Sequence, residues 1–374
     1  MQIKINNFVK KSRYIFVIFI IFFCWRISLF FLDLVSRNFI LSKSQFMGDI
    51  PWANFDGVHY LAIAQNGYGI YQQAFFPLFP ILINIVHNFL KIEYVSSGLL
   101  LANTFALLSV IMFYKLVRFD YGAKVALWSI IFFLVFPTSF FLGSVYTESL
   151  FLFFIFSSFY FARKGKFFYS AVFGMFATAT KFIGILLIPA VLWEIYMHCK
   201  EIKKTSIIPY VYALSIIPLG LLFYMFFLNS NYSDPLLFIH TQSAFGVNRT
   251  AGEVILLPQV LFRYLKIFIS VPFSNYELWV AVLEFVVFLT IFILLLKNIK
   301  KIRLSYLIFS SFAIIIPTLS GTLSSLPRYA LAAFPVFIIL GRVKSTKIKI
   351  FLLIISYFLL IILTSLFLRG YFVA

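Results

Sequence analysis

Residues 54 to 80, NFDGVHYLAIAQNGYGIYQQAFFPLFP, and the few residues before them hold a group of side chains suited to polar chemistry. Asp49 and Asp56 lie seven positions apart. His59 and Tyr60 follow Asp56 by three and four positions, the spacing at which side chains share one face of a helix. A carboxylate beside an apolar surface such as FFPLFP has its charged form disfavoured, which raises its pKa and makes it a better base. The pattern predicts polar chemistry at a lipid boundary.

Asp56 also has a purely structural interpretation. It precedes GVHYLAIAQ and is followed by NGY, which predicts a short helix over about 57–65, capped by Asp56 and closed at Gly67. A capping carboxylate stabilises a helix by roughly 0.5–2 kcal/mol relative to alanine and requires no chemistry. His59 and Tyr60 likewise either shape a binding pocket or pack on FFPLFP. Spacing alone leaves these alternatives open.

The composition places this stretch in a membrane protein. The chain is 63% hydrophobic and 11% charged, with a mean hydropathy of +1.01, whereas soluble domains are about 45–50% apolar and 25% charged. Runs such as YIFVIFIIFFCW and FLLIISYFLLIILTSLFL reach or approach the ~20 residues that cross a bilayer, and they lack the period-two pattern of a membrane barrel. The sequence therefore predicts an all-α, polytopic membrane protein.

The basic residues orient the chain, because Lys and Arg are retained on the cytoplasmic side. The formal charge of +19 does not indicate a nucleic-acid partner, since the basic residues form short clusters between apolar runs. With the N-terminus in the cytoplasm, 21 of the 31 Lys and Arg residues lie inside. About eleven spans are predicted, near 14–34, 97–117, 126–143, 148–163, 167–180, 183–198, 207–228, 278–296, 304–320, 328–341 and 350–368. A single membrane-embedded domain, 1–374, then has two large outer segments, 35–96 and 229–277.

Two segments are constrained by this orientation. The run at 75–90 must not cross, so it is predicted to be an interfacial or re-entrant helix opened by Pro77 and Pro80. Residues 166–200 are predicted to form two short spans that meet near Lys181 on the outer side, with one long tilted helix as the alternative.

Metal or disulfide chemistry has little support in the sequence. The two cysteines and four histidines are scattered without the spacing of a disulfide framework or a zinc motif. Two aspartates seven residues apart make a weak case for a divalent cation. No cofactor is expected.

Four segments resemble the PIG-V-like mannosyltransferases, whose best-known member adds the second mannose to GPI anchors. FDGVHYLAIAQNGY together with FFPLFP resembles their first luminal loop. The resemblance continues in the same order through FPTSFFLGSVYTESLFLFF (136–154), GKFFYSAVFGMFATATKFIGILL (165–187) and LPRYALAAFPVF (326–337). This chain departs from the family pattern in having no Trp directly before Asp56. It also has Lys181 where Arg is common, and the two are not equivalent for bidentate phosphate binding.

The resemblance implies a membrane glycosyltransferase of the C-type fold. Such an enzyme takes a sugar, here mannose, from a polyprenyl-phosphate donor on the non-cytoplasmic side and transfers it with inversion to a lipid or glycan acceptor. It would lie in the plasma membrane of a prokaryote or the endoplasmic reticulum of a eukaryote. The reaction needs a base for the acceptor hydroxyl, for which Asp56 is the first candidate and Asp49 the second. His59 and Tyr60 would then contribute to the substrate pocket.

The leaving polyprenyl phosphate needs cations that offset its developing charge. The candidates are Arg328, then Lys181 and Arg249. Arg328 could instead extend from the end of a span to the interface, and Lys181 could pair with Glu148 between helices. Glu148, after GSVYT at the outer mouth of a span, either orients the sugar or complements the positive start of a helix.

Two other classes of function share parts of this pattern. A transporter or lipid-linked oligosaccharide flippase also has many spans and a basic surplus, but its polar groups gather near the bilayer centre, whereas here they gather in outer segments. A polysaccharide polymerase shares a large outer loop, but it does not account for the four family-like segments.

Overall fold

The computed structural model describes residues 2–43, 50–203, 207–245 and 254–373, and these contain helices and no strand. The α-helices are α1 (Gln2–Phe39), α2 (Asp56–Asn66), α3 (Leu78–Leu90), α4 (Tyr94–Tyr121), α5 (Ala123–Leu134), α6 (Glu148–Arg163), α7 (Phe167–Thr180), α8 (Leu187–Glu201), α9 (Ile208–Ile216), α10 (Leu219–Tyr232), α11 (Leu237–His240), α12 (Leu257–Ser270), α13 (Tyr276–Lys297), α14 (Leu304–Thr318), α15 (Leu326–Tyr329), α16 (Pro335–Gly341) and α17 (Thr346–Leu368). Short 3₁₀ helices are η1 (Pro51–Ala53), η2 (Gln72–Ala74), η3 (Ser139–Gly143), η4 (Phe182–Leu186), η5 (Thr241–Phe245) and η6 (Ala330–Ala332). The predicted all-α fold is confirmed.

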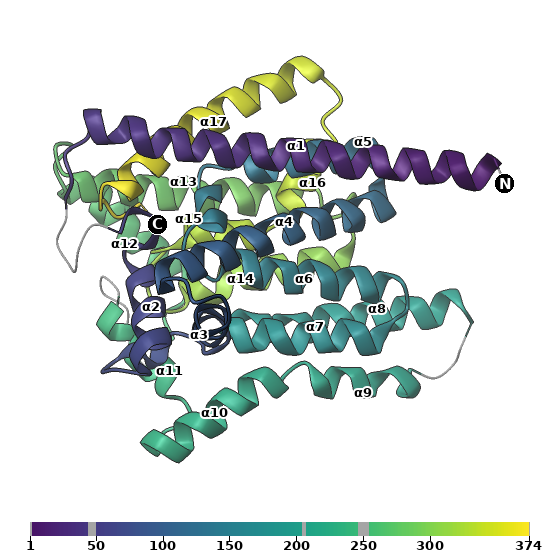
Figure 1. Cartoon of the computed structure of the whole chain (residues 1–374), viewed down its shortest axis with the longest axis horizontal. Helices are drawn as coiled ribbons and strands as arrows, with labels where there is room; N and C mark the ends of the chain where they lie inside the picture. The colour runs from purple at the N-terminus through teal and green to yellow at the C-terminus, as the bar shows by residue number, and fades with distance from the viewer. Residues whose placement is uncertain (1, 44–49, 204–206, 246–253, 374) are drawn as a thin grey trace.

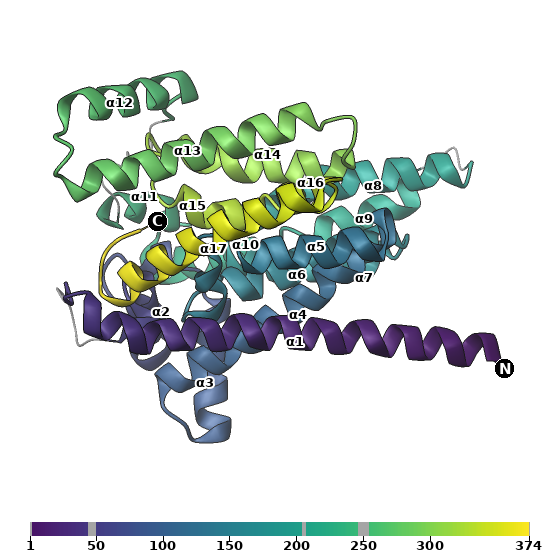
Figure 2. The same ribbon diagram turned by 90° about the horizontal axis from the view of Figure 1, so that it is seen from above.

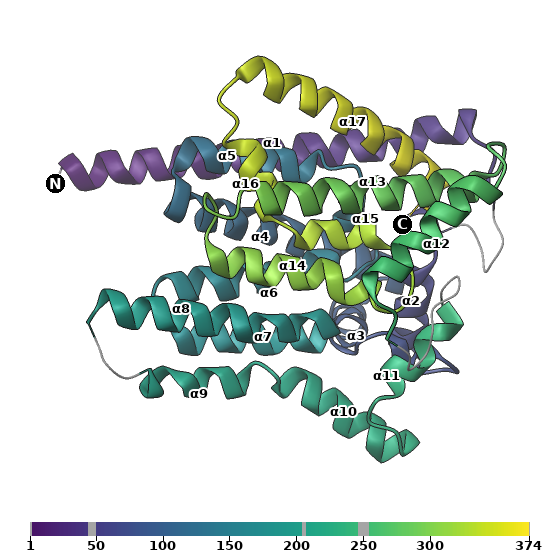
Figure 3. The same ribbon diagram turned by 180° about the vertical axis from the view of Figure 1, so that it is seen from behind.

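The long helices form one bundle with a distinct end. α1, α4, α6, α7, α8, α13 and α14 run along a common direction, and α2, α3, α11 and α12 gather at the end where α1 finishes (Figure 1). α9 and α10 form an outer layer beside α7 and α8 (Figure 3). The N-terminus of α1 and the cap of short helices therefore lie at opposite ends of the bundle.

The bundle is that of a multi-pass membrane protein. Six helical segments of the described chain are long and apolar enough to cross a membrane, the longest being Tyr94–Tyr121. Four further apolar helices have 10–17 residues, namely α3, α5, α7 and α14. Helical segments occupy all eleven predicted span positions. Because several are shorter than the ~20 residues that cross a bilayer alone, the number of spans stays a prediction.

Helix α3 has the character expected of an interfacial helix. It begins after Pro77 and has Pro80 in its first turn. Phe79 and Ile83 are buried, whereas Ile81 is exposed together with other apolar residues of the opposite face. Figure 1 shows α3 nearly end-on, across the bundle direction, and Figure 2 shows it standing out from the side of the bundle. Its 13 residues extend only about 20 Å, less than the ~30 Å hydrocarbon core.

The chain between 166 and 200 forms two helices, so the alternative of one long helix is wrong. α7 ends at Thr180, and Lys181 adopts extended backbone angles of φ −153° and ψ 143°. The 3₁₀ helix η4 then leads into α8, which runs back beside α7 (Figures 1 and 3). A Cβ atom on Gly184 would lie 2.6 Å from the backbone carbon of Ala177. Glycine at 184 therefore permits this close return of the chain.

A buried network of charges joins four helices at the end of the bundle away from α2 and α3. Glu194 on α8 accepts hydrogen bonds from Arg303 Nε and Nη2 at 2.6 and 2.8 Å, and from the Ser305 hydroxyl at the start of α14. Arg163 at the end of α6 lies 3.5 Å from Glu194 and 2.7 Å from Asp120 at the end of α4. The sequence did not predict this network, because its members lie far apart along the chain.

We expect Glu194→Gln to lower the free energy of unfolding by about 3 kcal/mol, because removing one partner of a buried ion pair leaves the other uncompensated. Reversible unfolding in bicelles would measure this loss. Glu201→Gln, an exposed carboxylate on the same helix, is the matched control and should change the stability by less than about 0.5 kcal/mol. Equal stability of the two variants would contradict a structural role for the network.

Candidate active site

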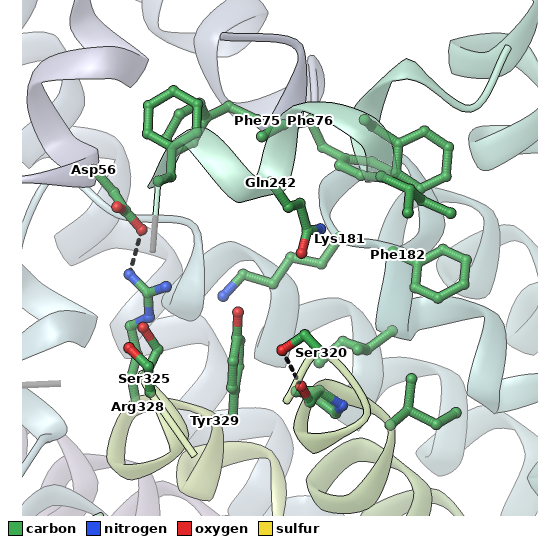
Figure 4. Close-up of a pocket in the computed structure, with 18 of the residues that line it drawn as sticks. Asp56, Phe75, Phe76, Lys181, Phe182, Gln242, Ser320, Ser325, Arg328 and Tyr329 are labelled. Atoms are coloured by element: carbon green, nitrogen blue, oxygen red, sulfur yellow. Dashed lines mark hydrogen bonds and ion pairs between the residues drawn. The ribbon is translucent and has the colours of Figure 1, made fainter. Parts of the chain in front are cut away.

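A cavity of about 360 Å³ opens at the end of the bundle that carries the short helices. Its polar wall includes Asp56, Lys181, Arg328 and Tyr329. Its apolar wall includes Phe75, Phe76, Ile183, Phe238, Phe245, Ile316 and Leu319. Figure 4 shows the side chains of Asp56, Arg328, Lys181 and Tyr329 pointing toward the same part of the cavity.

Asp56 does not cap α2, so the capping interpretation is wrong. It is the first residue of the helix, and Phe55 holds the cap position without a side-chain hydrogen bond to the helix. Phe55 has φ 58° and ψ −117°, a conformation that non-glycine residues rarely adopt and that costs on the order of 1–3 kcal/mol. The predicted closure at Gly67 is confirmed, because its N–H donates to Ile63 O at 3.0 Å with φ 78°. The strained entry directs the Asp56 carboxylate to the cavity.

Arg328 forms an ion pair with Asp56. Its Nη1 atom donates to Asp56 Oδ2 at 2.5 Å (Figure 4). The side chain is 10% exposed, and its Cζ atom lies 5.4 and 5.6 Å from the ring centres of Tyr146 and Tyr329. Ser325, with φ 65°, precedes α15 and accepts the Arg328 backbone N–H. Aromatic rings on more than one side therefore fix the direction of the guanidinium.

Lys181 and Glu148 form the second ion pair. Lys181 Nζ donates to Glu148 Oε1 at 2.5 Å, which matches the helix-to-helix pair considered from the sequence. Glu148 Oε1 also lies 3.3 Å from Arg328 Nε, an ion-pair contact whose N–H is not aligned for a hydrogen bond. Lys181 Nζ lies 5.6 Å from the ring centre of Tyr329. Glu148 is the first residue of α6, where the helix dipole favours a carboxylate.

These contacts join four side chains into one chain of alternating charge: Asp56, Arg328, Glu148 and Lys181. Each comes from a different one of the four segments that resemble the PIG-V-like family. Residues separated by up to 272 positions thus meet at one point. Asp56 is 29% exposed and faces the cavity, whereas Glu148 is 4% exposed and is absent from the cavity wall.

The other sequence candidates occupy different positions. Tyr60 lines the cavity, and its hydroxyl lies 3.5 Å from that of Thr147. His59 lies outside the cavity lining, with its ring 5.0 Å from those of Phe75 and Phe245. Asp49 and Arg249 lie outside the described residues, so their places in the site stay a prediction.

Two tyrosines that the sequence did not single out also shape the site. Tyr329 follows Arg328 in LPRYALAAFPVF and lies between the two cations. Tyr224 on α10 donates its hydroxyl to Gln73 O at 2.7 Å and so holds the backbone just before Phe75. Adjacency to Arg328 was an available signal for Tyr329. Tyr224 is one of 21 tyrosines and lies in an apolar run, so its sequence context does not distinguish it.

The described residues contain no group of three or more His, Cys, Asp or Glu side chains placed to hold a metal ion. The expectation of no cofactor stays a prediction. The cavity offers a carboxylate that can accept a proton and two cations that can hold an anion, within walls that are largely aromatic and aliphatic. That combination suits a reaction in which a hydroxyl loses a proton while a phosphate leaves.

Comparison with known proteins agrees with the family seen in the sequence. Residues 40–200 match the family described as mannosyltransferase (PIG-V). This range includes Asp56, Glu148 and Lys181, whereas Arg328 lies beyond it. No curated protein is significantly similar in sequence.

Two solved structures are similar to this chain at low sequence identity. ArnT from Cupriavidus metallidurans bound to undecaprenyl phosphate is 14% identical with a TM-score of 0.53, over 89% of this chain and 62% of that chain. An oligosaccharyltransferase from Archaeoglobus fulgidus in the apo form is 11% identical with a TM-score of 0.48, over 92% of this chain and 56% of that chain. This chain therefore spans less than two thirds of their length.

The fold and the family match together define the class. The chain has the C-type fold of membrane glycosyltransferases, which the likeness to ArnT supports. The predicted likeness to the PIG-V mannosyltransferases is confirmed by the match over residues 40–200.

The environment of His59 gives a pH-dependent prediction. Burial lowers the pKa of the His59 imidazole below its usual 6.5, and the Asp56 carboxylate raises it by a smaller amount. The unfolded chain therefore binds this proton more readily than the folded chain, and His59 lowers the stability as the pH falls below about 6.5.

We expect Asp56→Asn to lower the pKa of His59 further, because the opposing charge is removed. NMR titration of the protein with labelled histidine rings would measure the shift, with His59→Gln to assign the signal. A pKa of His59 that stays at the usual value, or that rises in the Asn variant, would contradict this geometry.

Proposed function

We propose that this chain is an integral membrane glycosyltransferase that moves a sugar from a polyprenyl-phosphate donor to a hydroxyl of a lipid or glycan acceptor, with inversion. The family match points to mannose as the sugar. The observation that carries the proposal is the convergence of Asp56, Arg328 and Lys181 on one cavity at one end of the bundle.

The proposed reaction assigns one role to each charged group. Asp56 accepts the proton of the acceptor hydroxyl as its oxygen forms a bond to the anomeric carbon. The bond from that carbon to the phosphate oxygen breaks on the opposite face of the sugar, which inverts the anomeric centre. Lys181 and Arg328 face the negative charge that develops on the leaving polyprenyl phosphate. The atoms and charges balance without a further reactant.

The surroundings of the cavity favour such a reaction. Phe75, Phe76 and Phe245 line the cavity beside the charged groups, and charges act more strongly on one another near apolar groups than in bulk water. Bound undecaprenyl phosphate in the ArnT structure supports a lipid-phosphate substrate for this fold. The position of the cavity at the end of the bundle argues against a transporter, whose binding site would lie near the bilayer centre.

The proposal includes an orientation. The N-terminus of α1 lies at the end of the bundle opposite α2 and α11 (Figure 1), and residues of these two helices line the cavity. A cytoplasmic N-terminus therefore places the cavity on the outer side. The membrane would be the plasma membrane of a prokaryote or the endoplasmic reticulum of a eukaryote.

We expect Asp56→Asn to slow sugar transfer by at least about 100-fold, because the base is lost while the size of the side chain is kept. The assay measures transfer from radiolabelled polyprenyl-phosphate mannose to a lipid extract of the host by purified protein. Glu93→Gln, an exposed carboxylate-to-amide change in the same outer segment, is the matched control and should transfer at the wild-type rate.

Each other outcome of this assay has a defined meaning. Full transfer by the Asn variant would place the base elsewhere, with Asp49 tested next. Wild-type protein that transfers no mannose, glucose or arabinose would contradict the transferase proposal and favour a flippase.

We expect Arg328→Lys to lower kcat/KM by at least about tenfold. A single ammonium group cannot contact Asp56 and Glu148 in the way that the planar guanidinium does. The same transfer assay measures the loss, with Arg37→Lys as the control, since Arg37 is half-exposed and pairs with Asp33 away from the cavity wall. Equal kcat/KM for the two variants would remove Arg328 from the proposed machinery.

A further inference from the structure

Glu148 lies behind the cavity wall and contacts both cations that face the cavity. Its Oε1 atom is 2.5 Å from Lys181 Nζ and 3.3 Å from Arg328 Nε. Lys181 and Arg328 line the cavity, whereas Glu148 does not. One carboxylate oxygen therefore contacts two cations that both line the cavity.

The two cations need such a partner to act together. A lysine side chain is a flexible stem with a compact charge, and an arginine presents separate edges for hydrogen bonding. Two like charges that share one oxygen also repel each other, and the carboxylate between them offsets that repulsion. Fixed positions matter, because charge stabilisation costs least when the groups do not have to reorganise during the reaction.

The burial of Glu148 carries an energetic cost. Its Oε2 atom is buried and has no hydrogen-bond partner in the described structure. A buried polar atom without a hydrogen-bond partner destabilises the folded state, because it loses its contacts with water and gains none in return. The dipole at the start of α6 offsets part of this cost. An apolar residue would avoid the cost, so the position indicates that the charge itself is used.

We propose that Glu148 is a positioning residue that fixes Lys181 and Arg328 as a two-cation clamp for the phosphate of a lipid-linked sugar, without contacting that phosphate. This inference rests on the proposed function. Together with Asp56, the formal charges of these four side chains sum to zero. Loss of the Glu148 charge leaves one positive charge in excess, which attracts a phosphate more strongly while the two cations lose their fixed positions.

The test separates binding from transfer. For Glu148→Gln we expect a polyprenyl phosphate without sugar to bind as tightly as to wild type, or a few-fold more tightly, while kcat for transfer falls at least tenfold. Lys181→Met, which removes a group that faces the ligand, should weaken the same binding at least tenfold. Titration of the lipid into purified protein in nanodiscs measures binding, and the radiolabel assay measures kcat.

A second comparison tests whether Glu148 acts through Lys181. In a Lys181→Met background, adding Glu148→Met should slow transfer by less than Glu148→Gln slows the wild type. Losses of kcat that multiply as independent effects would overturn the inference. The double variant also removes both members of this buried ion pair, so it keeps the inference testable if Glu148→Gln does not fold. If Glu148→Gln does not fold, the double variant is compared with Lys181→Met alone. Weaker binding of polyprenyl phosphate by the double variant would then overturn the inference.

The remaining outcomes distinguish the inference from the proposed function. Glu148→Gln protein that loses polyprenyl-phosphate binding as Lys181→Met does, or that keeps the wild-type kcat, would overturn only the positioning role. Wild-type protein that neither binds polyprenyl phosphate nor transfers sugar would overturn the proposed function itself.

Discussion

The ion pair between Arg328 and Asp56 is the contact on which the candidate site depends, because it ties α2 to α15 in the C-terminal part of the chain. Moving a charged group out of water costs free energy, and the attraction between two ions offsets that cost only when their geometry is good. Here Arg328 lies 2.5 Å from Asp56 and has aromatic rings around its guanidinium. The carboxylate of Glu148 lies at its Nε edge. Phe55 and Ser325, which have positive φ angles, directly precede the helices that carry Asp56 and Arg328. The strained backbone therefore lies next to both members of this ion pair.

A second set of buried charges performs a comparable task at the other end of the bundle. Apolar helices in lipid gain little from the hydrophobic effect when they associate, so packing and polar contacts determine how they are arranged. Asp120, Arg163, Glu194 and Arg303 join α4, α6, α8 and α14 at this end. We infer that the two networks fix the positions of the helices along their axes, so that Glu148 on α6 and Lys181 after α7 reach the same depth.

The sequence predicted the elements well and the contacts less well. Apolar runs and basic clusters reflect the solvent around each segment. They therefore predicted the positions of the helices, the break at Lys181 and an interfacial α3. They did not predict which contact the Asp56 carboxylate makes at the start of α2. A carboxylate at the start of a helix predicts a cap, but the chain turns at Phe55 and the carboxylate meets an arginine 272 positions away. Propensity rules describe only neighbours in sequence, so contacts between α2 and α15 lie beyond them.

The half-polar stretch at 54–80 makes physical sense once both of its surfaces are considered. Phe75 and Phe76 line the cavity with the charged groups, whereas Pro77, Leu78 and Pro80 line a separate apolar groove of about 720 Å³ between α3, α7 and α10. Tyr224 fixes this wall by binding the backbone oxygens of Gln73 and Phe75. A wall that is aromatic on one side and aliphatic on the other separates a polar cavity from a lipid-like environment. A fully polar loop would admit water and weaken the interactions of Arg328 and Lys181, and a membrane span would leave no place for Asp56. The mixed composition of this segment follows from the need to satisfy both surroundings at once.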